Sequence, residues 1–202
     1  MNLNHKVDFI SEENYLEDEK SREIKHEYID GVCYAMAGAS RSHNLLSQSI
    51  ARLLSNHLDE THCNVFVADM KVKVSTKNNS KFFYPDVIVA CDDENGHDYY
   101  TDKPQIIVEV LSKATRRFDK MLKFEAYKTI SSLQEYVLIE QDFAEVEVCW
   151  RNNHWVSERY FLGDEVAFES IGLNLSVEAI YRRVQNEDVL EFLQAKEQKN
   201  QL

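Results

Sequence analysis

Two short apolar segments of this chain each carry a single carboxylate, and this combination constrains the fold more than any other feature. The first segment reads YPDVIVA and contains Asp86, and the second reads PQIIVEVLS and contains Glu109. Runs of β-branched and aliphatic residues of this length predict buried strands. Because alternate side chains of a strand point to opposite faces, Asp86 shares a face with Ile88, and Glu109 shares a face with Ile107. Neither acid lies on an evidently water-facing side.

Two buried acids need partners. Desolvation raises the pKa of a buried carboxyl group by up to ~3–5 units. At pH 7 this costs about 4 kcal/mol for each group, against a total stability of roughly 5–15 kcal/mol. Taken singly, each acid is explained equally well by a structural ion pair or by exposure at a strand end. Taken together on adjacent strands, Asp86 and Glu109 offer the hard oxygen ligands that Mg²⁺ prefers, and this favours a shared metal site.

Length and composition predict one globular domain over residues 1–185, followed by a charged C-terminal tail over 186–202. With 202 residues and 44% hydrophobic content, the chain is large enough for a substantial core. No apolar run approaches the roughly 18 residues of a membrane span, and the first residues, MNLNHKVDFISEEN, lack the apolar segment of a secretory signal. We therefore expect no membrane partner and a cytoplasmic location. The cysteines are scattered without a CxxC pair, so we expect small core residues rather than a zinc site or disulfides: Cys33, Cys63, Cys91 and Cys149.

The distribution of charge is uneven. The net charge of −12 counts against nucleic-acid binding, which depends on neutralising phosphates. However, the segment 113–128 holds six basic residues against only Asp119 and Glu125. A basic rim on an acidic protein is therefore compatible with the sequence, although such a run is more often a solvated face.

The pattern along the chain predicts helices at residues 11–20, 42–59 and 114–130, and a short one after Ser176 that is followed by a frayed end. Asp30-Gly31 within HEYIDGVCYAM is a hairpin signal. Strands are expected at 63–68, 70–75, 83–91 and 105–111, and then in a meander formed by EYVLIEQ, AEVEVCWR and NHWVSERYFL. In the segment 114–130 one stripe of side chains is apolar, and the neighbouring stripe consists of Asp119, Lys123 and Tyr127.

These motifs, in this order, resemble a known family. PDVIVA, IIVEVLS, the spacing Asp119-xxx-Lys123-xxx-Tyr127 and EYVLIE are similar to the Uma-two family of endonucleases, within the restriction-endonuclease-like PD-(D/E)XK superfamily. The upstream HEYIDGVCYAMAGAS followed by His43 resembles the opening segment of that family. The resemblance runs from about residue 8 to residue 180. It implies an α/β fold with a mixed central sheet flanked by helices and an additional antiparallel strand meander.

The resemblance also implies a reaction, namely Mg²⁺-dependent hydrolysis of DNA phosphodiester bonds, with Mn²⁺ as an alternative metal. Asp86, Glu109 and the backbone carbonyl of Val110 would bind the metal. Lys123 would take the place of the lysine expected two residues after the glutamate, where Leu111 stands. The remaining implied site residues are Glu27 as an additional acid of the site, His43 near phosphate, and Asp119 and Tyr127 as supports that orient Lys123. Basic residues that could meet the DNA backbone are Lys113, Arg116, Arg117 and Lys120.

Alternatives remain open at this point. The missing lysine after Glu109 is compatible with an inactive nuclease-like module that binds nucleic acid or a protein partner without cleaving it. Lys123 could be an ordinary i,i+4 partner of Asp119, Glu27 could form a salt bridge at the rim, and His43 could be an exposed histidine near a helix cap. Both strand acids could serve structural ion pairs only. A homodimer is compatible with the relatives, but nothing in the sequence periodicity demands it.

Overall fold

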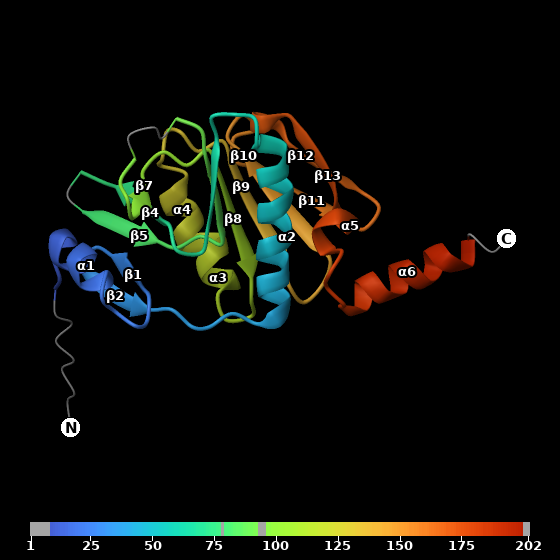
Figure 1. The fold of residues 1–202 in the computed structure, drawn as a ribbon, viewed down its shortest axis with the longest axis horizontal. Helices are drawn as coiled ribbons and strands as arrows, with labels where there is room; N and C mark the ends of the chain where they lie inside the picture. The colour runs from blue at the N-terminus through green and yellow to red at the C-terminus, as the bar shows by residue number, and fades with distance from the viewer. Residues whose placement is uncertain (1–8, 78, 93–95, 200–202) are drawn as a thin grey trace, which may run out of the picture.

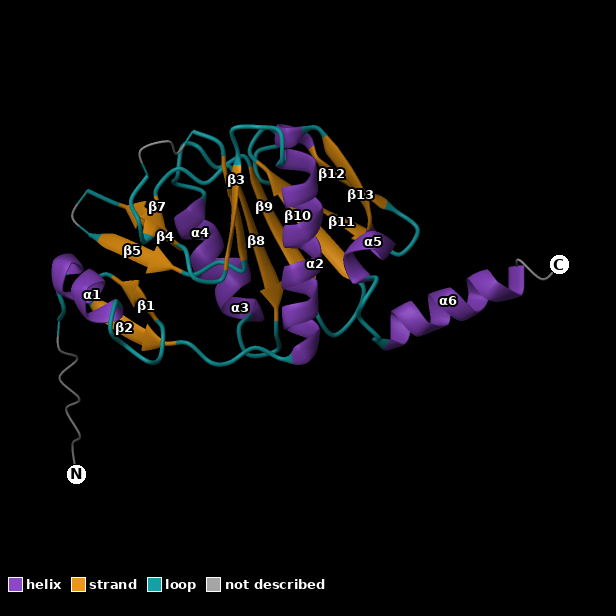
Figure 2. Cartoon of the chain, in the orientation of Figure 1, coloured by secondary structure: helices purple, strands orange, loops and turns teal. Residues whose placement is uncertain are grey.

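The computed structural model describes residues 9–77, 79–92 and 96–199, and its centre is a six-stranded mixed sheet (Figures 1 and 2). The strand order is β11-β10-β9-β8-β6-β3. Strands β8 and β9 pair in parallel, whereas the other neighbours in this sheet are antiparallel. The bounds are β3 Asn64–Val67, β6 Val87–Ala90, β8 Ile106–Leu111, β9 Glu135–Glu140, β10 Glu145–Trp150 and β11 Ser157–Phe161. The predicted α/β class with a mixed sheet, and the meander formed by β9, β10 and β11, are confirmed.

Both faces of the central sheet are covered, and this explains the continuous apolar runs of β6 and β8. Val108 of β8 faces helix α2 (Arg41–Leu58), whose Leu46 and Leu54 are fully buried. Ile107 faces the opposite way and joins a second core with Tyr127. The helix expected at 42–59 is thus confirmed. Figure 1 shows α2 running along one face of the sheet.

A smaller five-stranded sheet, in the order β2-β1-β5-β4-β7, lies beside the central one together with helix α1 (Figure 1). Its bounds are β1 His26–Ile29, β2 Val32–Ala35, β4 Lys71–Ser75, β5 Ser80–Phe83 and β7 Tyr100–Thr101, with α1 at Glu12–Glu19. The predicted hairpin turns at Asp30 and Gly31, which have φ values of 50° and 97°. Glycine adopts such values without a steric penalty, and aspartate tolerates them better than most residues.

The strand expected at 83–91 is wrong as a single element, because the chain there changes sheets. Strand β5 ends at Phe83 in the smaller sheet, and β6 begins at Val87 in the central sheet. Pro85 stands between them, and proline is disfavoured inside a central strand because it lacks a backbone N–H. The corner Tyr84-Pro85-Asp86 therefore places Asp86 at the junction of the two sheets.

The helix expected at 114–130 is divided into three parts, namely α3 (Arg116–Phe118), the π-helix η1 (Asp119–Lys123) and α4 (Phe124–Tyr127). Of the predicted apolar stripe, Phe118 and Ala126 pack against the core, whereas Leu122 is 40% exposed. The polar stripe of Asp119, Lys123 and Tyr127 is buried. A single turn of π-helix is rare and is frequently found at functional sites.

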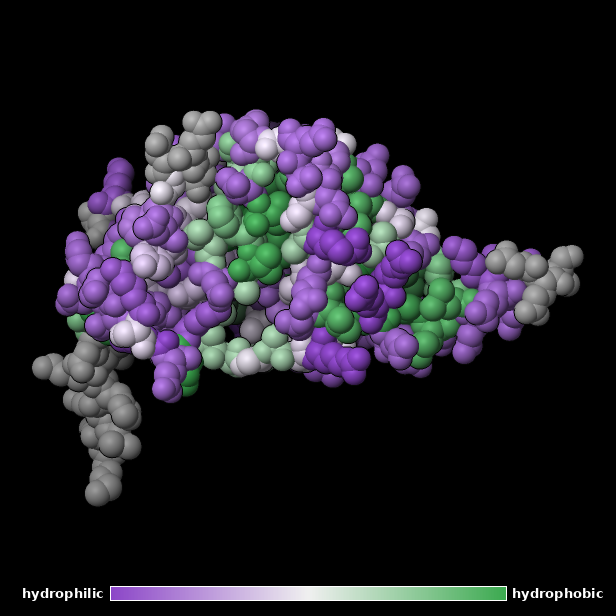
Figure 3. Space-filling model, in the orientation of Figure 1, coloured by the Kyte–Doolittle hydropathy of each residue, from purple (hydrophilic) through white to green (hydrophobic). Residues whose placement is uncertain are grey.

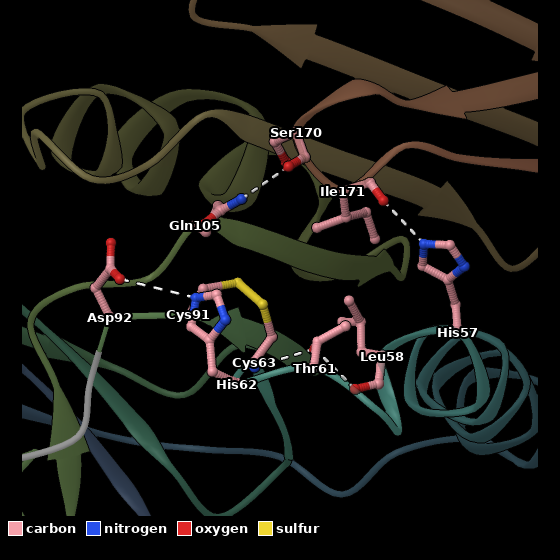
Figure 4. Close-up of a disulfide and its surroundings, with 10 residues drawn as sticks. All are labelled: His57, Leu58, Thr61, His62, Cys63, Cys91, Asp92, Gln105, Ser170 and Ile171. Carbon is pink, nitrogen blue, oxygen red and sulfur yellow. Dashed lines mark hydrogen bonds and ion pairs between the residues drawn. A yellow bond between two sulfur atoms is a disulfide. The ribbon is translucent and has the colours of Figure 1, made fainter.

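The expectation that all four cysteines are unpaired core residues is wrong. Cys63 and Cys91 form a disulfide (Figure 4). Strands β3 and β6 are antiparallel with Asn64 opposite Ala90, so the two cysteines are the next pair outward. The two cysteines are 28 residues apart in the sequence, and nothing in the sequence shows that β3 pairs with β6. The disulfide could therefore not be predicted. Of the two free cysteines, Cys33 is partly exposed and only Cys149 is buried.

The C-terminal part adds a two-stranded sheet and two helices. The bounds are β12 Glu165–Phe168, β13 Leu173–Ser176, α5 Val177–Tyr181 and α6 Glu187–Lys199. Helix α5 matches the short helix expected after Ser176, but α6 occupies most of the segment expected to be frayed, and it projects away from the body (Figure 1). The division into a domain over residues 1–185 and a tail over 186–202 stays a prediction. Residues 93–95 and residues 200–202 of the predicted tail lie outside the described residues. None of the helices in the described ranges has the length and apolar character needed to span a membrane.

Candidate active site

The two strand acids lie opposite each other at one end of neighbouring strands. Strands β6 and β8 are antiparallel with Val87 opposite Val108, so Asp86 and Glu109 are the next pair along. The Asp86 carboxylate accepts a hydrogen bond from the backbone N–H of Val110, with an Oδ2–N distance of 2.7 Å. The convergence suggested by the sequence is therefore present in the fold.

Lys123 is the centre of this group, although it lies on another element. Its Nζ is 2.9 Å from Oε1 of Glu27, 3.1 Å from Oε1 of Glu109 and 3.2 Å from Oδ1 of Asp119. The side chain is almost completely buried, with 5% of the residue exposed. An ordinary i,i+4 pair with Asp119 accounts for only one of these three contacts. The lysine that pairs with Glu27 is this central lysine and not one at the rim.

Two tyrosine hydroxyls donate hydrogen bonds to residues of this group. Tyr127 lies one helical turn after Lys123, and its hydroxyl donates a hydrogen bond to Oε1 of Glu109 at 3.3 Å. The Tyr136 hydroxyl donates to the backbone carbonyl of Asp119 at 3.0 Å. Tyr136 was not among the predicted site residues, because its position depends on the parallel pairing of β8 and β9. This register sets Tyr136 opposite Ile107, on the same face as Glu109.

His43 lies in the first turn of α2, where the Ser40 side chain caps the helix by accepting the His43 backbone N–H at 3.1 Å. Its Nε2 is 3.3 Å from Oδ2 of Asp86, and its side chain is only 17% exposed. Burial lowers the pKa of His43, but the Asp86 carboxylate and a hydrogen bond to the Val110 backbone outweigh burial, and the pKa is raised overall. His43 thus contacts two of the three predicted metal ligands and is not an exposed capping histidine.

These side chains form what we call the acid cluster: Glu27, Asp86, Glu109 and Asp119 with Lys123. Burial, together with the charges of the other three acids, raises the pKa of Glu109 well above its usual value even though Lys123 opposes this rise. Burial lowers the pKa of Lys123, but its carboxylate neighbours outweigh burial and raise this pKa well above normal. Lys123 is therefore charged, and the acid cluster still lacks positive charge.

The acid cluster fits a divalent cation in its donor chemistry. In the described part of the chain, no group of three or more His, Cys, Asp or Glu side chains is arranged to hold a metal by itself. Mg²⁺ does not require such a group, because it is usually held by one or two carboxylates, several waters and substrate phosphates. Asp86 and Glu109 would supply the carboxylates, and the Val110 carbonyl would supply a further hard oxygen. The uncompensated negative charge favours the same ion.

The acid cluster opens into a cavity of about 700 Å³. One wall is the corner Tyr84–Asp86 with Phe118 and the start of α3, and the other is the β1–β2 hairpin and the connection that follows it. We call this connection, residues 35–40, the strap. Figure 3 shows a hollow beside the strap, between the smaller sheet and α2. Ser40 and His43, at the N-terminus of α2, also line the cavity.

The basic residues expected to meet DNA are only partly available. Arg116 donates two hydrogen bonds to Glu140, at 2.8 and 2.6 Å, and Lys120 bonds Glu147 at 2.8 Å. Lys113 and Arg117 are exposed. The position two residues after Glu109 is Leu111, which is fully buried in the core. No lysine could therefore stand there and reach solvent, and the only lysine amine at Glu109 among the described residues comes from Lys123.

Comparisons with known proteins agree with this architecture. The chain is 36% identical over 177 residues to the uncharacterized protein slr1290 of Synechocystis sp., covering 86% of this chain and 92% of that protein. A second uncharacterized Synechocystis protein, sll1609, is 35% identical over 167 residues, which cover 80% and 90% of the two chains. A crystal structure described as a putative nuclease of DUF820 from Anabaena variabilis has a TM-score of 0.65 at 16% identity, over 86% of this chain and 98% of that one, and thus shares the fold. The model of the Uma2 family, described as "Putative restriction endonuclease", matches residues 12–178, and the chain belongs to this family.

Proposed function

We propose that this protein is a metal-dependent endonuclease that hydrolyses DNA phosphodiester bonds at the acid cluster. The observation that carries this proposal is the excess of buried negative charge around Lys123, at the floor of a cavity that solvent can enter. Uncompensated buried carboxylates are costly, and the cost is relieved either by protonation, as the raised pKa of Glu109 indicates, or by a bound cation. Family membership supports a nucleic-acid substrate.

In this proposal Asp86, Glu109 and the Val110 carbonyl hold Mg²⁺ or Mn²⁺. When bound, such an ion activates water and neutralises charge on the phosphoryl oxygens. Lys123 lies 3.1 Å from Glu109 and can direct its charge at the attacking water or at the developing charge of the transition state. Glu27 and Asp119 fix the Lys123 amine, and Tyr127 fixes the Glu109 carboxylate.

In this proposal a phosphate of the substrate lies between the acid cluster and the N-terminal end of α2, where His43 stands. The N-terminus of this 18-residue helix carries unsatisfied backbone N–H groups that favour anions, and its first turn contains no acid. A phosphate at this place would therefore meet His43 and the helix N-terminus on one side and the acid cluster with its cation on the other. We expect His43 to contribute to substrate binding more than to the chemical step.

A plasmid-nicking assay with Mg²⁺ and with Mn²⁺ tests the proposal. We expect Asp86→Asn and Lys123→Ala each to lower the nicking rate by at least about a hundredfold, as is typical for a lost electrostatic contact to the reacting groups. Lys128→Ala is the matched control, because Lys128 lies on the same helical segment, pairs only with the exposed Glu125 and does not line the cavity. Circular dichroism of each variant excludes unfolding as the cause. Nicking that persists in both site variants would identify a contaminating nuclease and contradict the proposal.

One observation favours a second function, a nuclease-like module that binds nucleic acid without cleaving it. The three carboxylate contacts of Lys123 match the number of N–H donors that an ammonium group has. A lysine held in this way could be structural only. Wild-type protein that binds DNA but never nicks it, with either metal, would favour this alternative.

A further inference from the structure

The strap lines the site cavity and is held by hydrogen bonds at both ends. At its first end the backbone N–H of Met36 donates to the carbonyl of Lys25 at 2.9 Å. At its second end the Ser40 hydroxyl bonds the Gln141 side chain at 2.7 Å, while Ser40 also caps α2. Figure 1 shows this connection bridging from β2 to the start of α2, and Figure 3 shows the hollow directly above it.

The reacting groups lie deep behind this strap. Glu109 and Asp119 are each 3% exposed. The cavity of about 700 Å³ has the size of a pocket for one drug-sized molecule. In a DNA duplex the bases are paired and stacked, so bringing one nucleotide into such a cavity costs the energy of unpairing and unstacking its base. A single strand has a flexible backbone that can carry one nucleotide into such a cavity.

The lining of the cavity also matches a single strand better than a duplex. Tyr34 is 50% exposed and lies opposite Glu27 in the β1–β2 register, so that it lines the cavity next to the acid cluster. Phe118 also lines the cavity, although its ring packs against Phe83. Aromatic side chains bind unpaired bases by stacking, regardless of sequence. Cations along the backbone support the binding of both DNA forms, but stacking adds affinity for unpaired bases, and it does not need Arg116 and Lys120, which are already paired with acids.

We propose that the substrate of this site is single-stranded DNA, either an unpaired strand or the single-stranded arm of a duplex, with one base stacked on Tyr34. This inference rests on the proposed nuclease function, because it specifies which DNA reaches the acid cluster. The strand passes between the strap and the corner Tyr84–Asp86. Its phosphate reaches His43, which lines the cavity beside Asp86 and whose side chain is 17% exposed.

A cleavage experiment compares end-labelled DNA of one sequence in three forms: a single strand, a blunt duplex and a duplex with a single-stranded arm. We expect the single strand and the arm to be cut at least about tenfold faster than the paired region. Duplex cleavage at an equal or greater rate would overturn the inference while leaving the nuclease function intact. Absence of cleavage in every form would contradict the nuclease function, and the inference is then decided by binding.

The binding experiment uses fluorescence anisotropy of the same labelled DNA without divalent metal. We expect the single strand to bind at least about tenfold more tightly than the duplex. Tyr34→Ala is expected to weaken single-strand binding about tenfold, a change within the range measured for a stacked base, and Tyr34→Phe to retain it. Tyr99→Ala is the matched control, since Tyr99 is 45% exposed and does not line the cavity. Equal affinity for both DNA forms, or no effect of Tyr34→Ala, would overturn the inference.

Discussion

Two groups of charged side chains lie at the central sheet, and they differ in their balance of charge. The acid cluster contains four carboxylates and one lysine. The second group, which we call the paired cluster, contains three carboxylates and three bases: Glu140, Asp142 and Glu147 with Arg116, Lys120 and Arg159. Glu140 is 2% exposed, so it is as well buried as Glu109.

The pKa shifts follow the balance of charge rather than burial alone. Burial raises the pKa of Glu147, but hydrogen bonds from Lys120 and Ser157 and the nearby positive charges outweigh burial, and the pKa is lowered overall. In Glu109, by contrast, one lysine does not offset burial and three other acids, and the pKa is raised. The protein therefore neutralises one group with its own cations, whereas the other keeps an imbalance that the proposed metal would relieve. A buried carboxylate indicates a site only when its own partners do not balance it.

The largest expected effect is the loss of the single cation of the acid cluster. Lys123→Ala leaves its buried carboxylates without any lysine, and removing one partner of a buried ion pair typically costs about 3–5 kcal/mol. We expect a loss of this size in the free energy of unfolding, measured with urea at neutral pH without divalent metal. Lys128→Ala, whose partner Glu125 is exposed, should change stability by less than about 0.5 kcal/mol. An equally small effect of Lys123→Ala would show that the carboxylates are already neutral.

A smaller loss is expected in the paired cluster. Glu140→Gln removes the carboxylate that accepts two hydrogen bonds from Arg116. Because the Arg116 side chain is 32% exposed, water compensates part of the loss, and we expect about 2 kcal/mol in urea unfolding. Asp142→Asn is the control, since Asp142 lies 3.6 Å from Arg116 and is 35% exposed. A stability gain in Glu140→Gln would contradict the view that this cluster is balanced.

Divalent metal should distinguish the two clusters. If the acid cluster binds Mg²⁺, metal at ten times its dissociation constant stabilises the folded protein by about 1.4 kcal/mol. We expect thermal melts of the wild type and of Glu140→Gln to rise with Mg²⁺, and melts of Asp86→Asn to be insensitive. Calorimetric titration measures the dissociation constant independently. Equal stabilisation of Asp86→Asn would place the bound metal elsewhere.

Much of the site could be predicted from the sequence, because its signals are local. The parity of strand positions put Asp86 and Glu109 on apolar faces, and the spacing of four residues put Asp119, Lys123 and Tyr127 on one stripe. The contacts that depend on pairing between distant segments could not be predicted. Neither the disulfide of Cys63 with Cys91 nor the contact of Tyr136 with Asp119 leaves a trace within a single element.

The expectation of a single helix at 114–130 was wrong for a related reason. Hydrophobic periodicity shows which side chains share a stripe, and Phe118 and Ala126 do pack against the core. The neighbouring polar stripe is buried as well, because Glu27 and Glu109 offer Lys123 partners that the helix alone does not reveal. The ion pairs of Arg116 and Lys120 with acids of the paired cluster could not be predicted for the same reason. Hydrophobic periodicity alone therefore does not predict which side chains of a helix are buried where polar groups from other segments pair with it.

The smallest expected effect is a gain in stability from removing one charge of the acid cluster. Asp86→Asn keeps an oxygen that can accept the Val110 N–H, but it removes one of the charges that raise the pKa of Glu109. Without metal we expect a gain of about 1 kcal/mol at pH 7, because less like-charge repulsion remains and the lost attraction to His43 offsets only part of it.

The pH dependence of this gain gives its sign an independent check. The folded state holds the Glu109 proton more tightly than the unfolded state, so this carboxyl lowers stability as the pH rises from 4.5 toward its folded pKa. The gain in Asp86→Asn should therefore be absent near pH 4.5, where Glu109 is protonated in both proteins, and should grow toward neutral pH. Urea unfolding of both proteins across this range measures it. If the variant is less stable than the wild type at pH 7, Asp86 belongs to a balanced cluster like that of Glu140. This result would contradict the difference in charge balance between the two clusters.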